Sequence, residues 1–176
     1  MTIRRFTGWF GKTDGTTDIE FSLLAVPFIF FVIVIIELSL MFLGDAVLNG
    51  AVYDASRVIR TGAAQQSGDP ETAFGDALCS QAGLMLDCDA MEYQVETLES
   101  FEEADLEPEF DEDGHMIPVP FDAGAVSDIV IIRVTYLYPL LTPMIGQFFA
   151  DSPGNTKLLM ATTVMQTEPY DFEEDE

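Results

Sequence analysis

The apolar residues of this chain are concentrated in one long run near the N-terminus. From position 21 to position 43 the sequence reads FSLLAVPFIFFVIVIIELSLMFL, and its only charged residue is Glu37. As a helix this run would be about 35 Å long, and roughly 20 such residues suffice to cross the hydrocarbon core of a bilayer. The pattern predicts one transmembrane helix at about residues 21–43, in which Pro27 introduces a bend that membrane helices tolerate.

A helical period continues beyond the apolar run. Small or apolar residues recur three or four positions apart, and so share one helix face, at Val47, Ala51, Ala55 and Val58. Gly62 is suited to ending this helix. We therefore expect one long helix over residues 16–62, part of it in the membrane and part outside.

The next part of the chain, residues 63–168, has the signals of a small mixed domain. A second helix is predicted from Pro70 toward Gly83, because proline suits a first helical turn. Stretches rich in β-branched and aromatic residues predict three strands, at residues 92–98, 129–138 and 158–166. The expected fold class is α+β, with a long N-terminal transmembrane helix followed by a small domain of helix plus antiparallel sheet.

Two segments of the chain are dense in carboxylates. Residues 101–124 combine acidic residues with proline and glycine, a composition typical of a long loop rather than of a packed element. Residues 169–176 are predicted to be a solvated acidic tail.

Charge is distributed unevenly along the chain and predicts an orientation. The sequence has 7 Lys and Arg against 31 Asp and Glu, a formal net charge of −24. Cations precede the apolar run in a leader, residues 1–15, at Arg4, Arg5 and Lys12. Because positive residues favour the cytoplasmic side, we expect a cytoplasmic leader, a single membrane span and an acidic domain on the other side of the membrane. The acidic surface argues against nucleic-acid binding.

A cleavable secretory signal is the competing interpretation of the N-terminus. The apolar run is longer than the usual core of a signal peptide, which has about 7 to 15 residues, and no convincing cleavage site of small residues follows it. The run is therefore better explained as a retained anchor.

The two cysteines, Cys79 and Cys88, lie close together on the acidic side of the span. Outside the cytoplasm a disulfide between them is expected, and the alternative is a pair of reduced, packed thiols. A disulfide closing so short a loop would stabilise the fold by roughly 2 to 3 kcal/mol.

Directly before the span the chain reads Gly-Thr-Thr-Asp-Ile-Glu-Phe, from Gly15 to Phe21. A glycine, then glutamate at the fifth following position, then phenylalanine and an apolar run resembles the processing site of type IV prepilins. An isolated glycine and glutamate at this spacing would mark only the water boundary of an ordinary anchor. Here the basic leader, the glycine, the glutamate and the apolar run occur together in that order.

The chain resembles TadE-like minor pilins, or pseudopilins, of the tight-adherence (Tad) type IV pilus system, in patches along most of its length. The patches are TTDIEFSLLAVPFIFFVIVIIELSLMF, NGAVYDASRVIRTG, the spacing from Cys79 to Cys88, YPLLTP at residues 138–143 and ATTVMQTEPY at residues 161–170. The chain departs from the family's usual pattern in having few arginines in these landmarks and an unusually acidic loop.

This resemblance implies a structural role in pilus assembly, serving adhesion or biofilm formation. A prepilin peptidase would cleave between Gly15 and Thr16. The assembly residues would be Glu20, whose carboxylate would pair with the new N-terminal amine of a neighbouring subunit, and Phe21. The implied partners are the inner membrane, the peptidase, other pilins and the pilus assembly platform.

Glu37 allows two interpretations. It follows Glu20 by about 25 Å along a helix, which places it in or near the outer leaflet. Its carboxylate either reaches the lipid head groups or pairs with another subunit of the pilus or its platform.

Metal-binding and catalytic functions have weak support. The sequence resembles the start of a calcium loop at four residues, Glu109, Asp111, Asp113 and Gly114. Pro120 stands where such a loop needs a bidentate glutamate, so we expect no metal and no cofactor. The single histidine, His115, is expected to be solvated.

The sequence has no nucleophile motif, phosphate loop or nucleotide fingerprint, and we expect no enzyme. Two alternatives to a pilin remain. The first is an uncleaved, single-pass, membrane-anchored periplasmic binding module whose acidic loop holds a cation. The second, more distant, is an enzyme that uses one of the many carboxylates.

Overall fold

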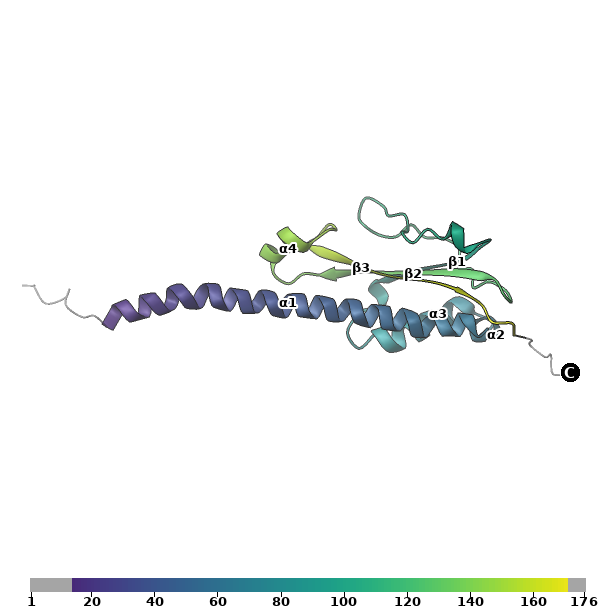
Figure 1. The fold of residues 1–176 in the computed structure, drawn as a ribbon, viewed down its shortest axis with the longest axis horizontal. Helices are drawn as coiled ribbons and strands as arrows, with labels where there is room; N and C mark the ends of the chain where they lie inside the picture. The colour runs from purple at the N-terminus through teal and green to yellow at the C-terminus, as the bar shows by residue number, and fades with distance from the viewer. Residues whose placement is uncertain (1–13, 171–176) are drawn as a thin grey trace, which may run out of the picture. The chain divides into compact units, whose positions relative to one another are not determined.

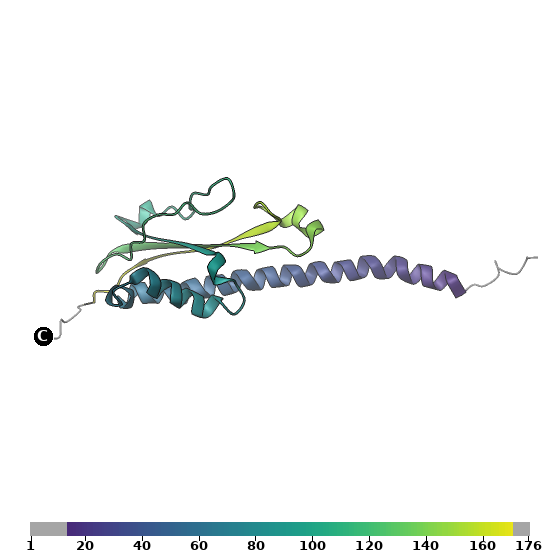
Figure 2. The same cartoon turned by 180° about the vertical axis from the view of Figure 1, so that it is seen from behind.

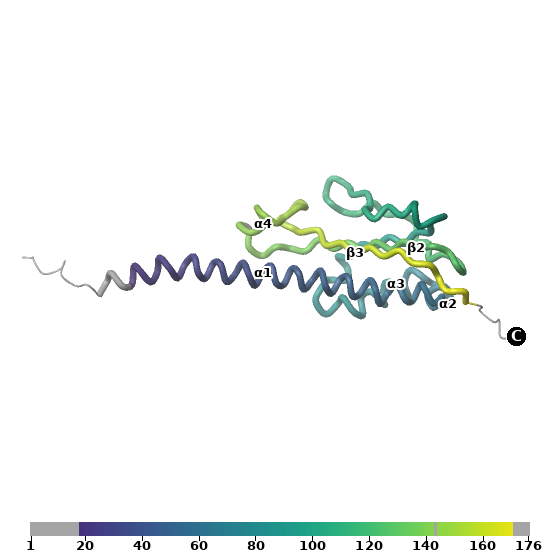
Figure 3. The backbone as a smooth tube through the Cα atoms, in the orientation of Figure 1, coloured from purple at the N-terminus to yellow at the C-terminus, as the bar shows by residue number. Residues whose placement is uncertain are grey.

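The computed structural model of the chain describes residues 14–170, with the side chains of residues 18–142 and 144–170 (Figure 3). Residues 1–13 of the expected leader and residues 171–176 of the expected tail lie outside the described residues. The chain forms two compact units that divide between Leu38 and Ser39. The helix α1 (Asp14–Arg60) continues through both.

The first unit consists, in its described part, of the N-terminal half of α1. Pro27 lies inside this helix, and the apolar side chains around it are mostly exposed. A helix that is apolar on all sides is stable only where it is surrounded by lipid or by other apolar surfaces. This part of the helix therefore needs lipid or another apolar surface around it to be stable.

The second unit contains the remaining helices and a three-stranded sheet (Figure 1). The helices after α1 are α2 (Ala63–Gln66), α3 (Pro70–Ala82) and α4 (Pro143–Phe149), with short 3-10 turns at Cys88–Ala90 and Phe101–Glu103. The strands are β1 (Met91–Leu98), β2 (Ile129–Pro139) and β3 (Thr156–Gln166), antiparallel in the order β1-β2-β3. The predicted α+β fold class is confirmed.

Local signals set the ends of the helices. Two arginines in the last turn of α1, Arg57 and Arg60, complement the negative end of the helix dipole. Gly62 then adopts a positive φ of 76°, which a residue with a side chain reaches only with strain. At the start of α3, the Asp69 carboxylate accepts a hydrogen bond from the Thr72 amide at 3.2 Å, and Pro70 occupies the first turn.

The two faces of the sheet are covered differently. The part of α1 that belongs to the second unit lies with α3 on one face, and the segment between β1 and β2 crosses the other (Figures 1 and 2). Strand pairing aligns Val95 with Ile132 on the helix-covered face, where Phe74 of α3 packs its ring against Tyr93. This layer is the core, to which α1 contributes fully buried residues one turn apart at Leu48, Val52, Ala55 and Ile59.

The segment from residue 101 to residue 124 differs from the prediction of an unpacked loop. It has no long helix or strand, but it is attached to the sheet, and Met116 and Ala123 within it are buried. Side chains of β1 and β2 supply hydrogen-bond partners for its backbone. Its composition correctly predicted the lack of regular structure. Its packing could not be predicted in this way, because it depends on side chains of the sheet that lie beneath it.

Candidate functional site

The residues of the predicted processing and assembly site lie at the start of α1. Gly15 and Thr16 belong to the first turn of the helix, and their side chains are outside the described part of the chain. Glu20 and Phe21 are both exposed on the helix one turn later. The structure thus places these four residues in one continuous helical segment that leads directly into the apolar run.

α1 has the properties of a membrane span. Within the described residues, one helix, Asp18–Arg60, is long and apolar enough to cross a membrane. Most of its large apolar side chains from Ile19 to Ile36 are exposed, among them Phe21, Phe28, Ile29 and Phe31. Soluble proteins rarely expose contiguous apolar surface of this size, so this helix indicates a single-pass membrane anchor. Glu37 differs from this run, since only 4% of it is exposed.

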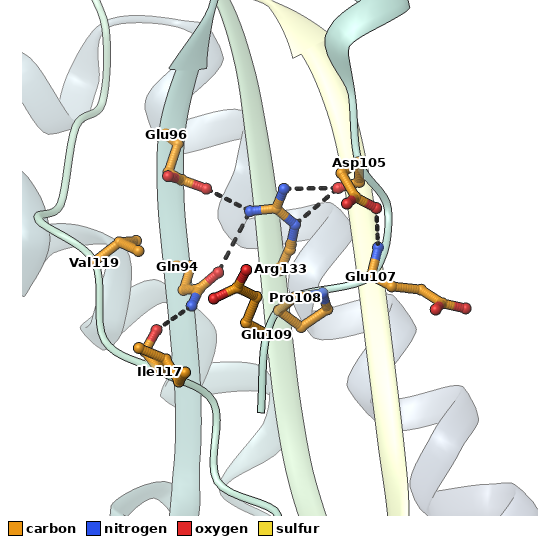
Figure 4. Close-up of a pocket in the computed structure, with 9 residues that line it drawn as sticks. All are labelled: Gln94, Glu96, Asp105, Glu107, Pro108, Glu109, Ile117, Val119 and Arg133. Atoms are coloured by element: carbon orange, nitrogen blue, oxygen red, sulfur yellow. Dashed lines mark hydrogen bonds and ion pairs between the residues drawn. The ribbon is translucent and has the colours of Figure 1, made fainter. Parts of the chain in front are cut away.

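Arg133 is the centre of a polar cluster in the second unit (Figure 4). It lies on β2 with 7% of its surface exposed. Its Nη1 donates to Glu96 Oε2 at 2.5 Å and to Gln94 Oε1 at 3.3 Å, both on β1. Its Nε and Nη2 donate to the Asp105 carbonyl oxygen at 3.0 and 2.6 Å. One guanidinium therefore connects two strands and the acidic segment.

A cavity of about 200 Å³ lies beside this guanidinium. Its acidic lining includes Glu96, Glu107 and Glu109, and the side-chain amide of Gln94 donates across it to the Ile117 carbonyl oxygen (Figure 4). Arg133 donates its hydrogen bonds to acceptors within the protein, and the surrounding carboxylates repel anions. The arrangement supports a structural connection between segment and sheet more than a ligand site.

A second contact attaches the acidic segment to β1. The Glu92 carboxylate accepts a hydrogen bond from the Met116 amide at 2.7 Å and lies 2.6 Å from His115 Nδ1. The hydrogen bond and charge of Glu92, together with the charges of Asp111 and Asp113, raise the pKa of His115. The expectation of a simply solvated histidine was incomplete, because this ring is exposed but paired.

One of the carboxylates that resemble a calcium loop, Asp111, has a local structural role. Asp111 Oδ1 accepts hydrogen bonds from the amides of Asp113 at 2.9 Å and His115 at 2.8 Å, which closes a tight turn. Gly114 in this turn has a φ of 86°. Across the described part of the chain, no group of three or more His, Cys, Asp or Glu side chains is arranged to hold a metal ion.

The cysteines form a disulfide, as predicted. Cys79 lies on α3 and Cys88 opens the 3-10 turn that leads into β1, with their Cα atoms 5.6 Å apart. The bond therefore connects the helix layer to the first strand of the sheet.

Sequence reasoning missed the role of Arg133 and did not predict the helix α4. A lone arginine within the apolar strand sequence IVIIRVTY is a usable signal, because a charge in a buried strand needs partners. Its partners could not be named in advance, since they come from β1 and from a segment without regular structure.

Comparison with known proteins supports the resemblance at the N-terminal segment. Residues 15–57 match the family model described as TadE-like protein. The match begins at Gly15 and extends through the apolar run into the buried face of α1, so the resemblance of this segment is confirmed. It supports an association with the Tad pilus. The similarities after residue 57 stay predictions. No curated protein and no solved structure gives a significant match.

Proposed function

We propose that this chain, TadE-like in its N-terminal segment, is a minor pilin of a tight-adherence pilus that a prepilin peptidase processes between Gly15 and Thr16. One observation carries the proposal: the TadE-like match starts at residue 15, the glycine of the expected processing site, and runs into an exposed apolar helix. The leader, residues 1–15, would then be removed.

The proposed mechanism is lateral packing of apolar helices. Cleavage creates an amine at Thr16, and Glu20 lies one helical turn further along α1. A carboxylate at the edge of the hydrocarbon is costly without a partner, and the amine of a neighbouring subunit supplies one. Phe21 and the exposed residues after it pack against other helices, first in the bilayer and then in an assembly that grows head to tail.

The proposed location is the bacterial inner membrane. The cations Arg4, Arg5 and Lys12 keep the leader in the cytoplasm, and the acidic domain lies in the periplasm or on the pilus surface. The disulfide suits an oxidising compartment. The partners are the peptidase, other pilins and the assembly platform, and the protein acts as a substrate of the peptidase rather than as an enzyme.

The test is to express the full chain with its cognate prepilin peptidase and to read the mature N-terminus by intact mass and peptide mapping. A start at Thr16 is expected, and Gly15→Val should abolish it because a β-branched side chain hinders the cleavage position. Gly8→Val, a matched change within the leader, should still be cleaved. A chain that still begins at Met1 would leave the anchored periplasmic module as the better interpretation.

Glu20 is tested separately from cleavage. Glu20→Ala should yield the mature chain but reduce its co-purification with other pilins, because the partner of the new amine is lost. Asp18→Ala, which removes another exposed carboxylate of the same helix, should behave like the wild type. Equal co-purification of both variants would contradict the assembly role of Glu20.

A further inference from the structure

The segment that contains α4 exposes large apolar side chains. Leu141 is 76% exposed, Met144 51%, Phe148 80% and Phe149 41%. Met144 and Phe148 are four residues apart and so lie on one face of the helix. Such a cluster on a folded domain marks a contact with a partner.

Buried side chains and hydrogen bonds hold α4 in place on its own domain, and so hold the exposed apolar side chains in place as well. Ile145 and Leu140 are buried. The Leu140 amide donates to the Asn155 carbonyl oxygen at 3.0 Å, and the Asn155 side-chain amide donates to the Leu140 carbonyl oxygen at 2.6 Å. The amides of Ile145 and Ala150 bond to the carbonyl oxygens of Thr142 and Gly146. These bonds pair part of the segment's backbone, which lowers the cost of moving it out of water.

The position of α4 in the second unit points to a lipid surface. A Cβ added to Gly44 of α1 would lie 3.3 Å from the ring of Tyr138 on β2 and 3.6 Å from Leu159 on β3. The ends of β2 and β3 that flank α4 therefore pack against α1 at this glycine. The residues immediately before Gly44 close the apolar run, and Phe42 among them is exposed. At the opposite end of the sheet, the Glu168 amide donates to the Arg60 carbonyl oxygen at 2.9 Å.

The charge pattern agrees with this position. No charged residue lies between Arg133 and Asp151, in a chain whose net charge is −24. An acidic protein is repelled by anionic head groups, and this uncharged segment can approach them at a lower electrostatic cost than the acidic stretches of the domain. Seven helical residues are too few to span a bilayer, whereas an apolar helix face enters the interface to a depth of about 5 to 10 Å.

We infer that α4 is a second membrane contact, which inserts Leu141, Met144 and Phe148 into the lipid interface beside the point where α1 leaves the bilayer. The inference rests on the membrane anchoring in the proposed function. It adds a shallow contact that holds the domain against the membrane before the subunit is extracted into an assembly.

The test uses the full chain in phosphatidylcholine vesicles, with one nitroxide label at a new cysteine and the native disulfide left oxidised. Accessibility to oxygen, which is enriched in lipid, is compared with accessibility to a water-soluble nickel chelate. Labels replace Phe148, then Leu141 as an independent second position. Val126, exposed just before the opposite end of β2, is the water control, and Phe31 in the span is the lipid control.

We expect labels at positions 148 and 141 to be less accessible to the nickel chelate and more accessible to oxygen than the label at position 126, at every protein-to-lipid ratio. Nickel accessibility at both positions equal to that at 126, with position 31 in lipid, would overturn the α4 inference and leave the anchor intact. Water-like values at position 31 would overturn the anchor itself, and the inference with it. Protection that disappears on dilution in lipid, with spin–spin broadening at high density, would assign the patch to a second copy instead.

Discussion

At the scale of single residues, Arg133 shows how a charge is accommodated beneath a loop. The guanidinium lies in the middle strand and is neutralised by Glu96, with Gln94 and the Asp105 backbone as further acceptors. These contacts join residues that are far apart in sequence. The acidic segment is therefore held on the sheet by a buried cation rather than by apolar packing alone.

Replacing Arg133 with methionine should destabilise the fold, because the buried acceptors lose their donor. We expect a loss of about 2 kcal/mol in the free energy of unfolding, measured by urea denaturation in detergent. The matched change Arg57→Met, at an exposed arginine of α1, should alter it by less than about 0.5 kcal/mol. Equal stabilities of the two variants would show that the Arg133 cluster contributes nothing.

His115 provides a pH-dependent contact. The pKa of its ring is raised by the hydrogen bond and charge of Glu92, so the folded chain holds the proton more tightly than the unfolded chain. The stabilisation is fully present below the unfolded pKa of about 6.5 and is lost as the pH rises through the raised folded pKa. The melting temperatures of wild type and His115→Gln should therefore differ at pH 6 and converge at high pH.

The same contact can be read directly by NMR, because the chain has a single histidine. The titration midpoint of the imidazole should lie above the ordinary value and should fall in Glu92→Gln. Glu112→Gln, on the same segment but outside the groups that raise the pKa, should leave the midpoint nearly unchanged. A midpoint that does not respond to Glu92→Gln would contradict the pairing.

At the scale of elements, the disulfide joins the end region of α3 to the entry of β1. Its closed loop is short, since the two cysteines are nine positions apart. Constraint of the unfolded chain by such a loop is worth about 2 to 3 kcal/mol.

The double variant Cys79→Ser, Cys88→Ser should lose about this free energy of unfolding, measured in urea without reductant. A reductant should lower the stability of the wild type but leave that of the double variant unchanged. Ser80→Ala, an exposed change beside Cys79, serves as the control and should change stability little. A double variant as stable as this control would show that the bond is dispensable.

At the scale of the whole molecule, the charge asymmetry predicts one orientation. Alkaline phosphatase, which folds only outside the cytoplasm, should be active when fused after Glu176, whereas β-galactosidase, which folds only in the cytoplasm, should be inactive when fused at the same position. Changing Arg4, Arg5 and Lys12 to glutamine should lower the activity of the phosphatase fusion, because the positive bias that orients the span is lost. An inactive phosphatase fusion together with an active β-galactosidase fusion after Glu176 would reverse the proposed topology.

Several properties followed from the sequence because they depend on neighbours along the chain. The apolar run requires no tertiary contact to be recognised, and the end of α1 near Gly62 and the start of α3 at Pro70 are set by local backbone preferences. The three strands appear where β-branched residues cluster. The disulfide was predictable because its cysteines are close together and the expected compartment is oxidising.

Only the tertiary structure decided which distant groups meet. The register of β1 against β2 places Gln94 opposite Arg133, and this pairing supplies the acceptors that hold the acidic segment. The sequence of α4 shows apolar residues that could equally well be core, and only the fold leaves Phe148 exposed at the end of the sheet nearest Gly44. Local preferences carry no information about such contacts, because their free energy arises only when the sheet brings the partners together.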